Sequence, residues 1–403
     1  MDVYLRILRV PRVGRLLAAN LLARLPIGIN GLAIILFLRA QTGSFAVAGL
    51  VAGALALGSG SGAPLQARLV DRHGRRVLVP LALAHAAGLL ALLALGTLGA
   101  PSLLLALTAL GAGLVLPPIS SVMRARYPAL LRADPALVRS AFALDSVLTE
   151  TIFTLGPLLT AVLVATLEPQ AALVLSAGAV VCGTVAFVTG LPPAPGGGEG
   201  RRSATGDALG ALRSPAIRTL VLATLPIGFA FGAIEVALPA FATEQDRPEL
   251  AGVLLAVWSL GSLVGGLVYG ARARSGPLPR VHLRLAVLVA VGFLPLLLAP
   301  SFAVMALLVI PAGVFVAPLI ATRNELAGTA APAGAETEAL TWPLTALVSG
   351  IALGAAVGGS LADGVGWRGA VVAGVLAAAL GATVAVLGRA RLGRAEAPPV
   401  LSS

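Results

Sequence analysis

The sequence predicts an all-α membrane protein whose twelve transmembrane helices form two pseudo-symmetric bundles of six. Three observations predict this fold: an apolar composition, twelve apolar runs of span length, and short motifs that occur in both halves. Of 403 residues, 58% are hydrophobic and only 11% are charged, whereas a soluble chain carries about 25% charged residues. Most of the chain must therefore lie in lipid.

The spans are read from runs of about 20 mostly apolar residues, the length that crosses a bilayer. Twelve such runs occur, at 16–38, 45–67, 78–99, 102–123, 140–165, 170–191, 216–241, 250–271, 283–299, 301–322, 338–361 and 367–388. The basic start of the chain lacks a convincing small-residue cleavage site before the first run. We therefore expect the first helix to be retained rather than cleaved as a signal peptide.

Arginine sets the expected orientation. All 28 basic residues are arginine, and 24 of them flank the spans on one side. The positive-inside rule places this side, and both termini, in the cytoplasm. Abundant Ala, Gly and Pro without lysine indicate a GC-rich bacterial genome, so we expect a multi-pass protein of the bacterial cytoplasmic (inner) membrane. The net charge of +11 is spread between apolar runs and not gathered in one patch, so no nucleic-acid partner is expected.

The two halves repeat each other. Leu-Pro-Ile-Gly occurs at 25–28 and again at 225–228, and "AGLVAGALALGSGSG" (48–62) matches "AGVLLAVWSLGSLVG" (251–265). A Pro- and Gly-rich loop divides the spans six and six. We predict an N-terminal bundle over 1–191, a cytoplasmic linker over 192–214 and a C-terminal bundle over 215–403.

Pro26 with Gly28, and Pro226 with Gly228, mark equivalent points in the first helix of each bundle. Proline removes a backbone hydrogen bond and can kink a helix, while glycine lets a neighbouring helix approach closely. Two like bundles related by an axis along the membrane normal suit an alternating-access transporter, with these positions as hinges. The alternative is a purely structural kink.

The loop "ARLVDRHGRR" (67–76) joins spans two and three. It resembles the signature loop of the major facilitator superfamily, whose pattern is roughly G-x-L-x-D-R-x-G-R-[RK]. The matching residues, besides Leu69, are Asp71, Arg72, Gly74, Arg75 and Arg76. The resemblance implies a twelve-helix transporter in which Asp71 latches the two halves in the outward-facing state. The residues alone predict a tight turn at Gly74 and arginines that hold the loop on the cytoplasmic face, which is the simpler alternative.

Gly156-Pro157 in span five resembles part of a glycine-proline signature of the family's antiporters, most of which export drugs or metabolites. Further glycines of that signature are Leu158 and Leu159 here. The resemblance favours efflux. Many proton-coupled members carry an arginine within span four, yet residues 102–118 hold no charge.

Charges at membrane depth are the candidate site residues, because each costs roughly 2.5–3.5 kcal/mol on insertion scales. They are Glu150 and Asp145 in span five, Arg24 in span one and Glu235 in span seven. We expect Glu150, on one helix face with Thr154 and Pro157, to bind and release a proton, with Glu235 as second candidate. The alternative is a structural ion pair of Arg24 with Asp145 or Glu150.

The predicted function is secondary active transport: proton-coupled export of a small organic molecule, a drug or secondary metabolite. Uptake or uniport of a solute such as a sugar is the first alternative, and a non-transporting membrane scaffold or sensor is the second. Enzyme chemistry is not expected, because the chain has no lysine for a phosphate-binding loop and no triad. His73, His85 and His282 are scattered, so no metal is expected. We expect no cofactor beyond the proton gradient, and a monomer in the lipid bilayer.

Overall fold

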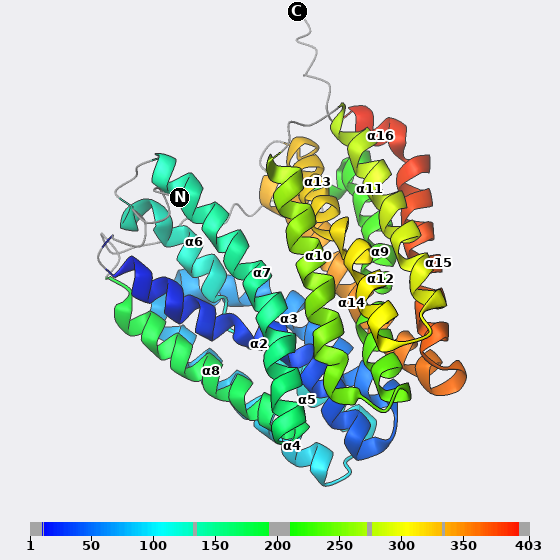
Figure 1. The fold of residues 1–403 in the computed structure, drawn as a ribbon. Helices are drawn as coiled ribbons and strands as arrows, with labels where there is room; N and C mark the ends of the chain where they lie inside the picture. Colours follow the sequence, from blue (N-terminus) through cyan, green and yellow to red (C-terminus); the bar gives the residue numbers. More distant parts are fainter. Residues whose placement is uncertain are drawn as a thin grey trace, which may run out of the picture. The chain divides into compact units, whose positions relative to one another are not determined.

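The computed structural model describes residues 10, 12–131, 135–192, 210–271, 276–332 and 335–394. Within these ranges the regular structure is helical and holds no strand. These residues contain twelve segments, each one helix or two successive helices, that are long and apolar enough to cross a membrane. The predicted all-α fold with twelve spans is therefore confirmed (Figure 1).

The first six spans comprise α2 (Val13–Thr42), α3 (Phe45–His73), η1 (Gly74–Val77), α4 (Leu78–Thr97), α5 (Ser102–Leu114), α6 (Ile119–Leu130), α7 (Pro135–Thr166) and α8 (Pro169–Gly190). The second six comprise η2 (Ala211–Arg213), α9 (Pro215–Glu244), η3 (Pro248–Leu250), α10 (Ala251–Ala271), α11 (Leu278–Phe293), η4 (Leu294–Leu298), α12 (Phe302–Val314), α13 (Val316–Thr329), α14 (Glu336–Val365) and α15 (Trp367–Leu387), followed by the short α16 (Arg389–Arg394).

The chain divides into two compact units. Unit 1 contains Met1–Gly43 and Ala54–Arg201, and unit 2 contains Ser44–Gly53 and Arg202–Ser403. The start of α3 thus groups with unit 2. Helix α3 therefore begins in unit 2 and continues in unit 1. Most of the predicted linker lies outside the described residues.

The helix bounds repeat in the two halves as the sequence motifs do. Helices α2 and α9 each have 30 residues, and α5 and α12 each have 13. A second helix follows α5 after four residues and α12 after one residue (α6 and α13), so the fourth and tenth spans are broken. The sequence prediction treated each of these spans as one helix and missed both breaks.

The repeated Leu-Pro-Ile-Gly lies at a helix crossing in each unit. Helices α2 and α9 continue through Pro26 and Pro226 without a break. A Cβ atom added at Gly28 would overlap the carbonyl oxygen of Ile152 in α7. One added at Gly228 would overlap that of Leu347 in α14. The motif therefore supplies the close approach of two backbones in both units.

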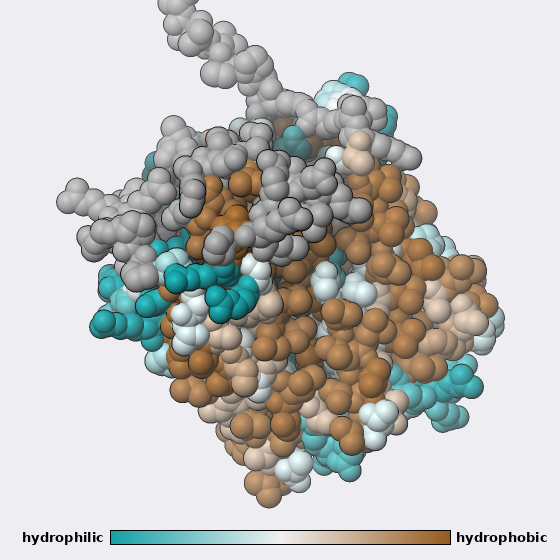
Figure 2. Space-filling view, turned by 60° about the vertical axis from the view of Figure 1, so that its left-hand side comes forward, coloured by the Kyte–Doolittle hydropathy of each residue, from teal (hydrophilic) through white to brown (hydrophobic). Residues whose placement is uncertain are grey.

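The surface is largely apolar where it faces the viewer in Figure 2. Large apolar side chains are exposed on many spans, among them Leu103, Leu307 and Leu376. A water-soluble protein does not expose contiguous apolar areas of this extent. These side chains face lipid, as expected for helices whose backbone groups are satisfied internally.

Candidate functional site

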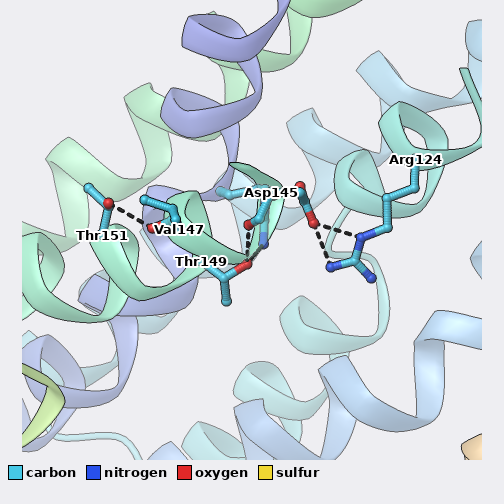
Figure 3. A network of polar contacts seen from close by, with 6 residues as sticks. Arg124, Asp145, Val147, Thr149 and Thr151 are labelled. Atoms are coloured by element: carbon cyan, nitrogen blue, oxygen red, sulfur yellow. Dashed lines mark hydrogen bonds and ion pairs between the residues drawn. The ribbon is translucent and has the colours of Figure 1, made fainter. Parts of the chain in front are cut away.

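A buried charge cluster joins three helices of unit 1. Arg24 lies eleven residues into α2, about 17 Å along the helix. Its Nη1 donates to Asp145 Oδ1 of α7 at 3.0 Å. Arg124 of α6 donates from Nε and Nη2 to Asp145 Oδ2, both at 2.6 Å. Figure 3 shows Arg124 reaching the Asp145 carboxylate, with Thr149 one turn further along α7.

The charges in this cluster do not balance. The Asp145 side chain is 1% exposed and Arg24 is 6% exposed, whereas Arg124 is 47% exposed. Arg24 also donates to Thr149 Oγ1 at 2.7 Å. Two guanidinium groups therefore hold one carboxylate, which leaves a net charge of +1. Both oxygens of the Asp145 carboxylate accept charge-assisted hydrogen bonds. Of the two pairings predicted for Arg24, the structure has the one with Asp145.

Glu150 is not part of the cluster, although it lies five residues after Asp145 on α7. At 3.6 residues per turn the two side chains point about 140° apart. Glu150 is half-buried and has no hydrogen bond or ion pair to a described residue. The Thr154 hydroxyl, one turn further on, is buried and also has no partner in the described part of the chain. Glu150 and Thr154 therefore form a separate polar face of α7.

Unit 2 also has an isolated carboxylate in a span, Glu235, although it is not at the position that the repeat relates to Glu150. It lies on α9 between the buried Ile234 and Val236 and is itself half-buried. No described residue gives it a hydrogen bond or ion pair. One turn earlier, Phe231 packs edge-to-face on Trp258 of α10, with ring centroids 6.1 Å apart. Glu235 thus stands at the edge of an apolar, aromatic environment.

A polar network that the sequence prediction missed surrounds the break in the fourth span. Pro117 and Pro118 have no N–H group, so the carbonyls of Gly113 and Leu114, four residues earlier, lose their helical donors. Gln66 Nε2 of α3 donates to the Leu114 carbonyl at 2.5 Å. His85 of α4 lies with Nδ1 2.8 Å from the Ala112 carbonyl. Since a carbonyl only accepts, Nδ1 of His85 carries the proton.

The same histidine continues the network into α2 and α8. With Nδ1 protonated, Nε2 of neutral His85 accepts from Asn30 Nδ2 at 3.4 Å. Ser176 Oγ donates to Asn30 Oδ1 at 2.5 Å. All three side chains are buried. The sequence prediction noted His85 only as a scattered histidine. The signal that could have found its role was the adjacent prolines inside an apolar run.

Unit 2 keeps the arginine of the repeat but not its carboxylate. Arg323 of α13, equivalent to Arg124, is 4% exposed. Its Nε and Nη2 donate to Asn324 Oδ1 at 3.2 and 2.8 Å, and its Nη1 has no partner in the described part of the chain. The crossing contacts pair Ile152 of α7 with Leu347 of α14, 195 positions later, so the position equivalent to Asp145 is Leu340. The cluster is therefore a property of unit 1.

The loop after α3 forms the predicted turn. Gly74 has φ of +67°, a left-handed conformation that glycine adopts without strain. Arg75 Nη1 donates to the carbonyls of Val188, at 3.2 Å, and of Leu191, both at the end of α8. Arg72 and Arg76 are exposed. The Asp71 side chain lies outside what the structure describes, so its latch role stays a prediction.

The antiporter-like pair Gly156-Pro157 lies inside α7. Gly156 faces Gly28: a Cβ atom added at Gly156 would lie 2.6 Å from the Gly28 carbonyl oxygen. Thr160 donates its hydroxyl proton to the Gly156 carbonyl at 3.0 Å. The pair therefore completes the crossing of α2 and α7.

An open groove of about 560 Å³ lies on unit 2 between α9, α14 and α15. Its lining is apolar and includes Leu225, Pro226, Phe229 and Leu376. None of the candidate charged residues lines it. Across the described residues, no three His, Cys, Asp or Glu side chains gather closely enough to hold a metal ion.

Twelve spans in two repeated sets of six, with isolated charges at membrane depth, define a multi-pass membrane transporter. A family model described as Major Facilitator Superfamily matches residues 16–333. The chain belongs to this superfamily, whose members are in general transporters and not enzymes. A search of curated protein sequences found no match.

Solved structures agree with this fold. A bacterial homologue of the human lysosomal transporter Spinster, in an inward-facing and unoccupied conformation, superposes with a TM-score of 0.73 at 15% identity, covering 96% of this chain and 99% of its own. The nucleoside transporter NupG gives 0.71 at 13%, covering 94% and 98%. The POT family transporter PepTSo gives 0.70 at 16%, covering 96% and 99%. At these identities the likeness is one of fold.

Proposed function

We propose that the protein exports a small organic molecule, a drug or secondary metabolite, by proton-coupled secondary transport. The supporting observation is the contrast among its membrane carboxylates. Asp145 is held by two arginines, whereas Glu150 and Glu235 have no partner among the described residues. A carboxyl group without a counter-ion gains and loses a proton at lower cost than one in a buried ion pair.

This contrast also assigns roles. Glu150 and Glu235 carry protons, one in each unit. Arg24 and Asp145 serve as a structural pair, because removing the Asp145 carboxylate would strand the buried Arg24 guanidinium. Pro26, Gly28, Gly156, Pro157, Pro226 and Gly228 are the points at which the helices of each unit cross or bend.

Proton release tests this proposal. The purified protein in weakly buffered detergent is titrated with a panel of cationic, neutral and anionic compounds, and the pH is followed. We expect release on binding in the wild type, and loss of release in Glu150→Gln or Glu235→Gln. Glu168→Gln is the matched control, because Glu168 is exposed in the loop before α8. Binding without proton release would contradict proton coupling.

Uniport or uptake is the second candidate, and one observation favours it: the fourth span holds no charge over residues 102–118. The similar structures include a nucleoside and a POT family transporter, so the fold does not choose the substrate. Proteoliposomes with and without a pH gradient separate the two candidates. Transport that is equally fast without a gradient would favour uniport.

The arginine bias supports a cytoplasmic position for both termini and for the loop at 67–76, in a bacterial inner membrane. The protein acts as a monomer in this proposal, since the two units together supply both proton carriers. Labelling of cysteines placed in the loops of intact cells, with a membrane-impermeant reagent, tests the orientation.

A further inference from the structure

The first turn of α3 is held by a carboxylate from the last turn of α14. Asp363 accepts hydrogen bonds from the Ser44 hydroxyl at 2.6 Å, from the Phe45 N–H at 2.8 Å and from the Ala46 N–H at 2.8 Å. All of these residues belong to unit 2. The N–H groups of a first helical turn have no partner within the helix. They also carry the positive end of the helix dipole, so a carboxylate suits this place.

Below this contact, α3 and α14 touch through their backbones. A Cβ atom added at Gly49 would overlap the carbonyl oxygen of Ala355, and one added at Gly359 would overlap that of Phe45. A Cβ atom at Gly53 would lie 2.5 Å from the Ala352 carbonyl oxygen. We call Gly49, Gly53 and Gly359 the glycine seam. At these three positions the backbone of one helix lies directly against the backbone of the other, at Ala355, Ala352 and Phe45.

The structure of the contact allows it to open without unfolding α3. Asp363 is exposed and Ser44 is partly exposed, so water can replace the carboxylate at the two N–H groups. Ser44 Oγ also accepts from the Val47 N–H at 3.2 Å, which is the usual local cap of a helix start. Helix α3 would therefore stay folded after the carboxylate leaves.

Helix α3 gives the contact its significance, because it begins in unit 2 and runs on from Ala54 as part of unit 1. We propose that Asp363 is a releasable clamp that keeps residues 44–53 of α3 on α14, and that the clamp opens once in each transport cycle. The opening in the cycle rests on the proposed transport function. The clamp itself does not.

Hydrogen–deuterium exchange of the full chain in lipid nanodiscs tests the clamp without a substrate. Asp363→Asn removes the charge and keeps the shape. We expect at least tenfold faster exchange over the whole glycine seam, in residues 44–53 and in residues 352–360 of α14. The matched control is Asp246→Asn, because Asp246 is an exposed aspartate in the loop after α9. It should leave the seam unchanged.

Two other outcomes would overturn the clamp. Faster exchange confined to Phe45 and Ala46 would mean that Asp363 is only a local cap. No change would mean that it holds nothing. Thermal unfolding of each variant verifies that the chain is folded. If Asp363→Asn does not fold, Asp363→Ser, which also removes the carboxylate and leaves the Ser44 cap in place, is used with the same expected pattern.

Cross-linking tests the opening. In a Cys182→Ala background, which removes the single cysteine, cysteines at positions 44 and 363 are joined by a short, reducible thiol cross-linker. We expect transport of the compound panel in proteoliposomes to stop and to return on reduction. Full transport by the cross-linked protein would overturn the opening. If the wild type transports no compound, the proposed function fails, and the exchange pattern still decides the clamp.

Discussion

Gly28 of α2 and Gly156 of α7 lie so close that neither position has room for a side chain: a Cβ atom at Gly156 would lie 2.6 Å from the Gly28 carbonyl oxygen. The partner atoms are backbone, so they cannot move aside as a flexible side chain would. The crossing of α2 and α7 therefore depends on glycine at both positions.

We predict that Gly28→Ala lowers the stability of the protein by about 1–3 kcal/mol, the usual cost of overpacking. Gly178→Ala in α8 is the control, because no atom lies within 4 Å of its added Cβ. It should be neutral or slightly stabilising, since alanine favours helix. Thermal unfolding in detergent measures both. Equal melting temperatures for Gly28→Ala and the wild type would contradict the crossing.

The buried ion pair makes a second prediction. Asp145→Asn leaves Arg24 as an uncompensated buried charge, at a cost of about 3–5 kcal/mol. Adding Arg24→Gln should recover part of this loss, because the stranded charge is then gone. A double-mutant cycle on unfolding free energies measures the coupling. Strictly additive losses would show that the two side chains do not interact.

A third prediction concerns the break in the fourth span. His85→Leu leaves the buried Asn30 Nδ2 without its acceptor, and Gln66→Leu leaves the Leu114 carbonyl without its side-chain donor. Each should cost about 1–3 kcal/mol, the penalty of an unsatisfied buried group. His73→Leu is the control, since His73 is exposed and contacts only the carbonyl one turn back. If His85→Leu and His73→Leu had the same melting temperature, the result would contradict a stabilising role for the His85 network.

The fourth prediction separates two neighbouring arginines. Arg75→Ala removes the bonds to the Val188 and Leu191 carbonyls and should destabilise the end of α8 by about 1.5–3 kcal/mol, as for hydrogen bonds from charged groups. Arg76→Ala, at an exposed position, should change stability by less than about 0.5 kcal/mol. Exchange rates of amides at the end of α8 provide the measurement. If both substitutions changed exchange at the end of α8 equally, Arg75 would have no special structural role, and both arginines would serve only to set the membrane orientation.

Much of the fold follows from the sequence because span length is set by the bilayer. The predicted span at 170–191 and the helix α8 at Pro169–Gly190 differ by one residue. The repeat was also visible in the sequence, because Leu-Pro-Ile-Gly occurs at 25–28 and again at 225–228. These features depend on local composition, which a sequence displays directly.

The site was harder to predict, because it depends on which helix faces which. The sequence left Arg24 open between Asp145 and Glu150, and only the packing of α2 on α7 chooses Asp145. The broken fourth span was hidden because its prolines stood near the expected end of an apolar run. Asn30 and Ser176 are 146 residues apart, and no spacing rule connects them.

The recurrence of one helix crossing in both units has an experimental consequence. Gly28 against Ile152 and Gly228 against Leu347 are two copies of the same packing problem within one polypeptide. Gly28→Ala and its counterpart Gly228→Ala, 200 positions later, probe the same kind of contact in the two units under the same lipid and buffer. If one substitution slows transport more than the other, the helix crossing in that unit matters more to the transport cycle.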